Sequence, residues 1–248
     1  MRFMPKTVLI LGGTKGLGLA LAWGAYYLKF NTIIAGRSVA DDNVRATFPP
    51  DSGSLVLDLA NPASCNNIAY LQSGPIDYIF WVAGILSRKP FGHFDIREMD
   101  QMTSIHLLGP LYALRLLHAS LAYKQKHPYH LITIASTSSW RIRENESLYC
   151  ALKAAKAAFT RNFARELVRD LPGSKVTLIN PGGIKTGLLN GTGQDTSNFM
   201  DPKVVSRTIW NEVVSQKTPF HEVQILRNNE GSPNVSYGSR LPEMPFQE

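Results

Sequence analysis

The chain alternates between short runs of apolar, often β-branched residues and longer segments in which apolar residues recur at helical spacing. The apolar runs predict strands at residues 7–11, 31–35, 54–57, 76–82, 129–135, 175–179 and 223–226. The segments between them predict helices at residues 17–28, 41–48, 62–72, 96–126, 148–169 and 202–216. Apolar strands that alternate with helices are typical of a parallel sheet buried on both sides. The predicted fold class is α/β: a single domain with a doubly wound parallel sheet and helices on both faces.

The longest predicted helix, at residues 96–126, contains the pair Gly109-Pro110. Proline has no backbone N–H, and its ring clashes with the preceding turn of a helix. We therefore expect this pair either to bend the helix or to be absorbed by close packing.

Composition supports one globular domain. The chain has 248 residues, of which 44% are hydrophobic and 18% charged, enough to bury one sizeable core. No break in composition, linker or internal repeat divides it. We expect a domain at residues 1–230, which includes a Gly-, Asn- and Thr-rich segment at 187–200 with the character of a mobile lid. A polar tail at residues 231–248 follows, wrapped around a neighbouring subunit or lying over the surface.

The net charge of +7 limits the kinds of partner. Lys and Arg are scattered, with short clusters such as Arg141 and Arg143, and no basic helix or zinc-ligand pattern accompanies them. We therefore expect no nucleic-acid partner, and an anionic small ligand explains the charge more simply. Cys65 and Cys150 lack metal-type spacing, which fits a reduced, cytoplasmic setting without a bound metal. The N-terminal residues lead into a strand too short for a signal peptide or a membrane span, so we expect no membrane association.

A glycine-rich turn joins the first predicted strand to the first helix. Its sequence at residues 11–18 is Leu-Gly-Gly-Thr-Lys-Gly-Leu-Gly. Glycines let the backbone turn sharply and approach a ligand, and free amides at a helix start attract phosphate. The pattern predicts a site for the pyrophosphate of a dinucleotide, although close packing of helix on strand is an alternative. The candidate residues are Gly12, Thr14, Lys15, Gly16, Leu17 and Gly18.

Arg37 places a positive charge directly after the second predicted strand. An acidic residue at this place would bind a ribose 2′-hydroxyl, whereas an arginine suits a 2′-phosphate. Lys15 supplies a second cation to the same group, so the sequence favours NADP(H), with two solvated surface cations as the alternative. Two further pairs follow strands: Asp58 with Leu59, expected at the adenine edge, and Ala83 with Gly84, expected to approach the cofactor closely.

Three candidate catalytic residues follow the fifth strand. Tyr149 and Lys153 lie four residues apart on a predicted helix, so their side chains share one face. A neighbouring ammonium favours the phenolate, so we expect it to lower the pKa of Tyr149. A hydroxyl from residues 136–139 would face the phenol and hold a substrate oxygen. Taken alone, a Tyr and a Lys one turn apart are more often a solvated helix edge.

These pieces together resemble the short-chain dehydrogenase/reductase family, closely as far as about Thr186 and more loosely to about Leu226. The glycine motif matches Gly12, Gly16 and Gly18, and Tyr149 with Lys153 matches the family's Tyr-x-x-x-Lys pair. Ser136 precedes Tyr149 by thirteen residues, the usual position of the family's serine, which selects it over Ser138. The segment after the sixth strand matches the family's Pro-Gly-x-x-x-Thr motif and adds the candidate cofactor residues Pro181, Gly182, Ile184 and Thr186.

The resemblance implies a Rossmann-like fold and a role for each catalytic residue. Tyr149 is implied to be the general acid, or the base in the oxidative direction. Lys153 is implied to hold the nicotinamide ribose and to tune the tyrosine, and Ser136 to orient the carbonyl. Hydride transfer from the nicotinamide then reduces a ketone or an aldehyde to an alcohol.

The chain departs from the family pattern at three places. The family's Asn-Asn-Ala-Gly segment reads Trp81-Val82-Ala83-Gly84, and its relay asparagine falls at His106. His106 either bonds a backbone carbonyl or a relay water, as a catalytic residue, or is a satisfied helix histidine. The tail also lacks the family's common Gly-Gly ending.

The leading hypothesis is an NADPH-dependent carbonyl reductase that acts on a small molecule and forms a homodimer or homotetramer through its two long helices. The alternative is a catalytically weak NADP(H)-binding sensor or scaffold, which Trp81, Val82 and His106 suggest. We expect the substrate pocket to be lined by residues 85–89, 138–143 and 187–200. Trp140, Arg141 and Arg143 permit an aromatic or anionic substrate, and surface arginines are the alternative.

Overall fold

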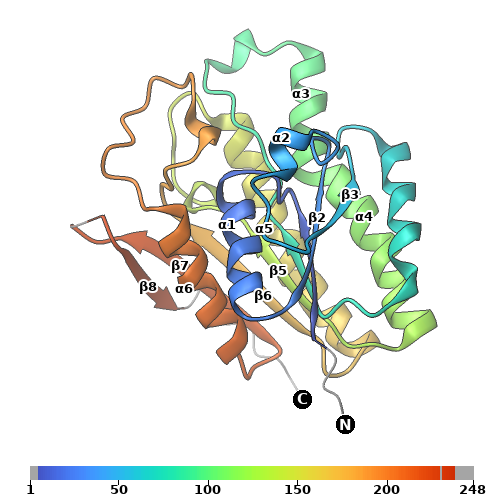
Figure 1. Cartoon of the computed structure of the whole chain (residues 1–248). Helices are drawn as coiled ribbons and strands as arrows, with labels where there is room; N and C mark the ends of the chain where they lie inside the picture. The colour runs from blue at the N-terminus through green and yellow to red at the C-terminus, as the bar shows by residue number, and fades with distance from the viewer. Residues whose placement is uncertain (1–4, 230, 238–248) are drawn as a thin grey trace.

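The computed structural model describes residues 5–229 and 231–237. Within them the chain forms one sheet with the strand order β3-β2-β1-β4-β5-β6-β7-β8 (Figure 1). Neighbouring strands pair in parallel, except that β7 and β8 are antiparallel. The strands are β1 (Thr7–Leu11), β2 (Asn31–Gly36), β3 (Gly53–Val56), β4 (Tyr78–Trp81), β5 (His130–Ile134), β6 (Lys175–Pro181), β7 (Phe220–Arg227) and β8 (Pro233–Tyr237). The predicted fold class, a doubly wound α/β sheet in a single domain, is confirmed.

Helices cover both faces of the sheet (Figure 1). They are α1 (Gly16–Tyr27), α2 (Asp42–Arg45), α3 (Ile96–Thr103), α4 (Gly109–His118), α5 (Ser147–Asp170) and α6 (Pro202–Ser215). Side chains alternate between the faces of a strand, so Val8 and Ile10 pack with α1 and α6. Leu9 and Leu11 pack with α4 and α5 on the other face. This two-sided burial explains why β1 and β4, in the middle of the sheet, consist almost entirely of apolar residues.

The predicted long helix is one run in which α-helical and π-helical segments alternate. The π-helical segments are Ser104–Leu108, directly before α4, and Ala119–Gln125, directly after it. Gly109 and Pro110 open α4, immediately after the first π-helical segment. A Cβ on Gly109 would lie 2.2 Å from the carbonyl oxygen of Leu59. Close packing therefore absorbs the Gly-Pro pair, with the irregular hydrogen bonding of the π-helical turn beside it.

Two segments differ from the sequence-based prediction. The segment Pro62–Ser73, expected to be an α-helix, is a 3₁₀ helix. Part of the predicted C-terminal tail, Pro233–Tyr237, is the edge strand β8 rather than a loose wrap. Val235 packs against the core cluster beneath α6, and pairing with β7 satisfies its backbone. Residues 238–248, the rest of the predicted tail, lie outside the described residues.

The strand order places one site at the crossover between β1 and β4. After β1 the chain adds β2 and β3 on one side, and then crosses to form β4 on the other side. The loops that follow β1 and β4 therefore leave the sheet side by side at its carboxyl edge, where doubly wound sheets bind ligands. The register pairs Leu11 with Trp81 at this edge.

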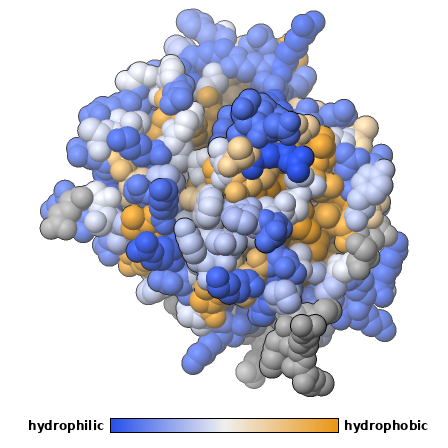
Figure 2. Space-filling view, in the orientation of Figure 1, coloured by the Kyte–Doolittle hydropathy of each residue, from blue (hydrophilic) through white to orange (hydrophobic). Residues whose placement is uncertain are grey.

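The face of the molecule shown in Figure 2 is mostly hydrophilic, with hydrophobic residues in small patches. Patches of this kind are common on globular proteins. Among the described helices, none is both long and apolar enough to cross a bilayer.

Candidate active site

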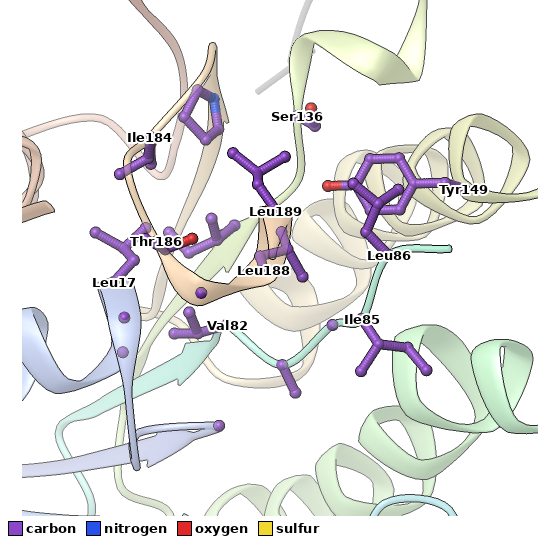
Figure 3. Close-up of a pocket in the computed structure, with 18 of the residues that line it drawn as sticks. Leu17, Val82, Ile85, Leu86, Ser136, Tyr149, Ile184, Thr186, Leu188 and Leu189 are labelled. Carbon is purple, nitrogen blue, oxygen red and sulfur yellow. The ribbon is translucent and has the colours of Figure 1, made fainter. Parts of the chain in front are cut away.

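A cavity of about 940 Å³ opens at the carboxyl edge of the sheet, over the crossover. This volume is within the range of small-molecule and cofactor sites. Every predicted cofactor-binding residue lines it, together with Ser136 (Figure 3). The segments that form its walls follow six different strands, β1 to β6, so the fold assembles in space what the sequence distributes over 175 residues between Gly12 and Thr186.

The glycine turn suits a dinucleotide because its glycines leave the backbone uncovered by side chains. Gly12 has φ +91°, and a Cβ there would lie 2.7 Å from backbone atoms of Ala83. A Cβ on Gly18 would lie 2.1 Å from the carbonyl oxygen of Gly12. Lys15, at the N-cap of α1, makes no side-chain cap hydrogen bond, so that side chain leaves the first amides of the helix free. The turn therefore combines close packing with amides that are free to bind an anion.

Cations line the end of the cavity next to β2. Lys15 and Arg37 are both exposed there, and no ion pair among the described residues involves either. Asp58 lies nearby, and its carboxylate accepts a hydrogen bond from the N–H of Ala60 at 3.0 Å. Two available cations and a backbone-bound carboxylate suit the phosphates and the adenine of a dinucleotide.

The predicted catalytic side chains meet at the opposite end of the cavity. Tyr149 and Lys153 project from α5, and both are buried. Tyr149 directs its hydroxyl toward the cavity, which Ser136 lines from the far side (Figure 3). Ser136 accepts a hydrogen bond at 3.0 Å from the N–H of Ser138, which fixes its hydroxyl. The Nζ of Lys153 lies 5.5 Å from the centre of the Tyr149 ring and donates to the carbonyl of Ile134 at 3.2 Å.

The pKa of Tyr149 is raised rather than lowered, contrary to the sequence-based expectation. Burial is the largest cause, followed by the negative charge of Glu146; a side-chain hydrogen bond with Ser136 and the charge of Arg143 act in the opposite direction. Lys153 is not among the causes. Burial also lowers the pKa of Lys153 to about 8. Desolvation disfavours the charged form of both groups, so in this structure the Tyr149 phenol keeps its proton at neutral pH.

His106 lies behind the cavity rather than in its lining. Its Nε2 is 2.5 Å from the carbonyl oxygen and 3.0 Å from the N–H nitrogen of Ile85. Burial lowers its pKa, and the charges of Lys153 and Lys156 act in the same direction. In a neutral imidazole Nε2 either donates or accepts, so it serves one of the two Ile85 groups at a time. The ring packs edge-on against Tyr149, with centres 5.4 Å apart, so His106 supports the wall beneath the phenol.

Lys156 is a site residue that sequence reasoning missed. It is fully buried, its Nζ donates to the carbonyl of Ala83 at 3.1 Å, and it lies 4.5 Å from the ring centre of Trp81. Its place on α5, three residues after Lys153, is the signal that could have revealed it, because both side chains then point toward the sheet. Trp81, where the family pattern has asparagine, is the surface on which this lysine packs.

The comparisons with known proteins agree with this geometry. Residues 6–197 match the model of the short chain dehydrogenase family. An uncharacterized oxidoreductase of Staphylococcus aureus (strain MW2) is 25% identical over 209 residues, which are 82% of this chain and 89% of the relative.

Two solved structures with bound nicotinamide cofactors share the fold. The 3-ketoacyl-(acyl-carrier-protein) reductase from Brucella melitensis, complexed with NADH, has a TM-score of 0.77 at 20% identity and covers 88% of this chain and 96% of its own. An alcohol dehydrogenase from the archaeon Thermococcus sibiricus, complexed with 5-hydroxy-NADP, has a TM-score of 0.76 at 18% identity. The match covers 90% of this chain and 96% of the alcohol dehydrogenase chain. At these identities the likeness establishes the fold.

Burial of Lys156 predicts a pH-dependent stability. Burial lowers its pKa in the folded chain, and the charge of Lys153 lowers it further. The unfolded chain therefore binds more protons between the folded pKa and about 10.4, the ordinary lysine value, and stability rises with pH across that window. Lys156→Met lacks this titration. Its free energy of unfolding relative to that of the wild type should therefore fall by up to about 1.4 kcal/mol for each unit that the pH rises within this window. Urea unfolding at a series of pH values measures this difference.

Lys203→Met is the matched control, because Lys203 is an exposed lysine on α6. Its pH profile of unfolding should follow that of the wild type. A Lys156→Met profile parallel to the wild type at every pH would show that Lys156 does not lose its proton on folding.

Proposed function

The chain belongs to the short-chain dehydrogenase/reductase family, and on that premise we propose that it is an NADPH-dependent oxidoreductase. Its reaction interconverts a carbonyl compound, a ketone or an aldehyde, and an alcohol. The observation that carries this proposal is the meeting of Ser136 and Tyr149 at one end of the cavity, with Lys153 buried beside them. The family as a whole comprises oxidoreductases that bind NAD(P)(H).

Tyr149 is the proton donor in the proposed reduction. Its raised pKa keeps the phenol protonated at neutral pH, which suits donation to a carbonyl oxygen that gains negative charge. The Ser136 hydroxyl donates a hydrogen bond to the same oxygen and so favours the developing charge. A bound nicotinamide supplies the hydride that reaches the carbonyl carbon. Lys153 holds its proton below about pH 8, and its Nζ, 5.5 Å from the centre of the Tyr149 ring, suits a hydrogen bond to the nicotinamide ribose.

The cations at the adenosine end support NADP(H) as the cofactor. Lys15, Arg37 and Ser38 line this end of the cavity. No acidic residue near Arg37 in the sequence is part of the described lining. A guanidinium suits a 2′-phosphate, whereas a carboxylate at the same place would repel it. The solved relatives with bound cofactor include one NADH complex and one complex with an NADP analogue, so the preference rests on these side chains.

We further propose that residues 187–200 form a lid over the substrate, within a domain that spans residues 1–230. The two ends of this segment are fastened together, because the N–H of Lys185 donates to Met200 and the N–H of Met200 donates to Gly183, at 2.9 and 3.1 Å. Leu188 and Leu189 extend from the segment into the cavity (Figure 3). Tethered ends with an irregular middle suit a loop that closes on a ligand.

We expect a homodimer or homotetramer that uses α4 and α5. Leu108, Tyr112 and Tyr123, at α4 and its flanking π-helical segments, are large apolar residues exposed in the single chain, which suits burial against a second copy. A cytoplasmic location is expected from the free thiols of Cys65 and Cys150.

A catalytically weak NADP(H)-binding sensor is the alternative. The departures that suggested it are Trp81, Val82 and His106. Trp81 and His106 lie behind the cavity and act as supports, the first for Lys156 and the second for Ile85. Val82 lines the cavity. None of the three displaces Ser136, Tyr149 or Lys153. NADPH oxidation with a panel of ketones and aldehydes separates the two functions, because a sensor binds the cofactor without turnover.

Replacement of the proton donor should abolish turnover and spare cofactor binding. Tyr149→Phe removes the hydroxyl and keeps the buried ring, so kcat should fall by about 10²–10⁴-fold while the Kd of NADPH changes little. Stopped-flow NADPH oxidation and fluorescence titration measure the two quantities. Tyr27→Phe, at an exposed tyrosine at the end of α1 and outside the cavity lining, is the control and should leave both unchanged. Undiminished kcat in Tyr149→Phe would remove the tyrosine from the mechanism.

Reversal of the charge at Arg37 should shift cofactor preference. A hydrogen bond to a charged group contributes about 1.5–3 kcal/mol, so the ratio of the NADPH and NADH dissociation constants should move toward NADH by about 10- to 100-fold in Arg37→Asp. Arg45→Asp makes the same charge change on α2, outside the cavity lining, and serves as the control. If both variants give the same ratio, Arg37 does not contact the cofactor.

A further inference from the structure

The substrate end of the cavity carries two arginines that the proposed reaction does not use. Arg141 and Arg143 follow β5 and line the cavity near Tyr149. No ion pair in the described part of the chain involves either guanidinium. Sequence reasoning left open whether these are ordinary surface arginines. Their place in the cavity lining argues for a ligand.

The backbone that carries both arginines is fastened at several points. The N–H of Arg141 donates to the carbonyl of Thr137 at 3.1 Å. The N–H of Glu146 donates to the carbonyl of Arg143 at 3.4 Å, and the N–H of Lys89 donates to Asn145 at 2.9 Å. The arginine side chains therefore extend from fixed positions, and less conformational freedom is lost when they hold a ligand.

The local charge balance favours an anion. Glu146 is the one acidic side chain lining this end of the cavity in the described structure, and it lies 3.7 Å from the guanidinium of Arg88. The other acidic lining residue, Asp58, belongs to the adenosine end. Arg143 is close enough to the phenol to lower the pKa of Tyr149. The charge of Arg143 thus reaches the place where the carbonyl would react.

Apolar side chains line the cavity around the phenol of Tyr149. Ile85 and Leu86 approach from the loop after β4, and Leu188 and Leu189 from the opposite segment (Figure 3). These walls suit a hydrocarbon chain and offer no polar partner to it. A ligand that satisfies all three features has a carbonyl, an apolar body and an anionic end.

We propose that the substrate of this site is an oxo acid, whose carbonyl lies at Tyr149 and whose carboxylate is bound by Arg141 and Arg143. This inference rests on the proposed carbonyl reduction. The planar guanidinium group matches a carboxylate with paired hydrogen bonds. Hydride adds to the carbonyl carbon and the Tyr149 proton adds to its oxygen, while the carboxylate is unchanged. The product is the corresponding hydroxy acid.

The test compares acids with their esters. Methyl ketones that end in a carboxylate, in a homologous series of chain lengths, are each assayed beside the methyl ester, which has the same carbonyl and chain without the charge. The wild type should show a higher kcat/KM for the acid at a preferred chain length. In the double variant Arg141→Gln/Arg143→Gln the ratio of acid to ester kcat/KM should fall by about 10- to 100-fold. The ratio cancels any general effect of Arg143 on Tyr149.

Arg207→Gln, an exposed arginine on α6 outside the cavity lining, is the control and should leave the ratio as in the wild type. Acids and esters reduced equally well by the wild type, or a ratio unchanged in the double variant, would overturn the oxo-acid assignment and leave the carbonyl reductase intact. NADPH binding without oxidation by any acid, any ester or a panel of uncharged ketones and aldehydes would overturn both.

Discussion

The close contact between the backbones of Gly12 and Ala83 is the constraint on which the rest of this site depends. The carbonyl of Leu11 accepts hydrogen bonds from the N–H groups of both Val82 and Ala83, at 3.0 and 2.9 Å. This pulls the loop after β4 against the glycine turn, where a side chain on residue 12 would collide with Ala83. The floor of the cavity is formed at this junction, so the crossover of the sheet also determines where the cavity lies.

The floor is held from below by two basic side chains. Lys156 donates to the carbonyl of Ala83, and His106 bonds the backbone of Ile85. Burial lowers the pKa of each, so the folded structure disfavours their charged forms. Such groups are costly in an apolar interior unless they are partnered. Burying these two side chains lowers the stability of the fold, but it also fixes the segment that lines the cavity beside the reacting groups.

The sequence predicted what is contiguous along the chain. The strands, the glycine turn and the Tyr149–Lys153 pair could be found because each is a local pattern, and the residues predicted to bind a cofactor all line one cavity. Lys156 was missed because its partners, Trp81 and Ala83, are more than seventy residues away, and a lysine in a helix ordinarily indicates solvent. β8 was missed because it is a five-residue edge strand that begins with proline and has a single aliphatic residue, Val235. The direction of the Tyr149 pKa shift depends on burial, which spacing alone does not reveal.

A crystal structure of the protein with bound NADP⁺ tests the central claim most directly. The account predicts the pyrophosphate against the glycine turn, the 2′-phosphate between Lys15 and Arg37, and the nicotinamide above Ala83 within reach of Tyr149. A dinucleotide bound elsewhere, or in the reverse direction with its nicotinamide at Arg37, would contradict it.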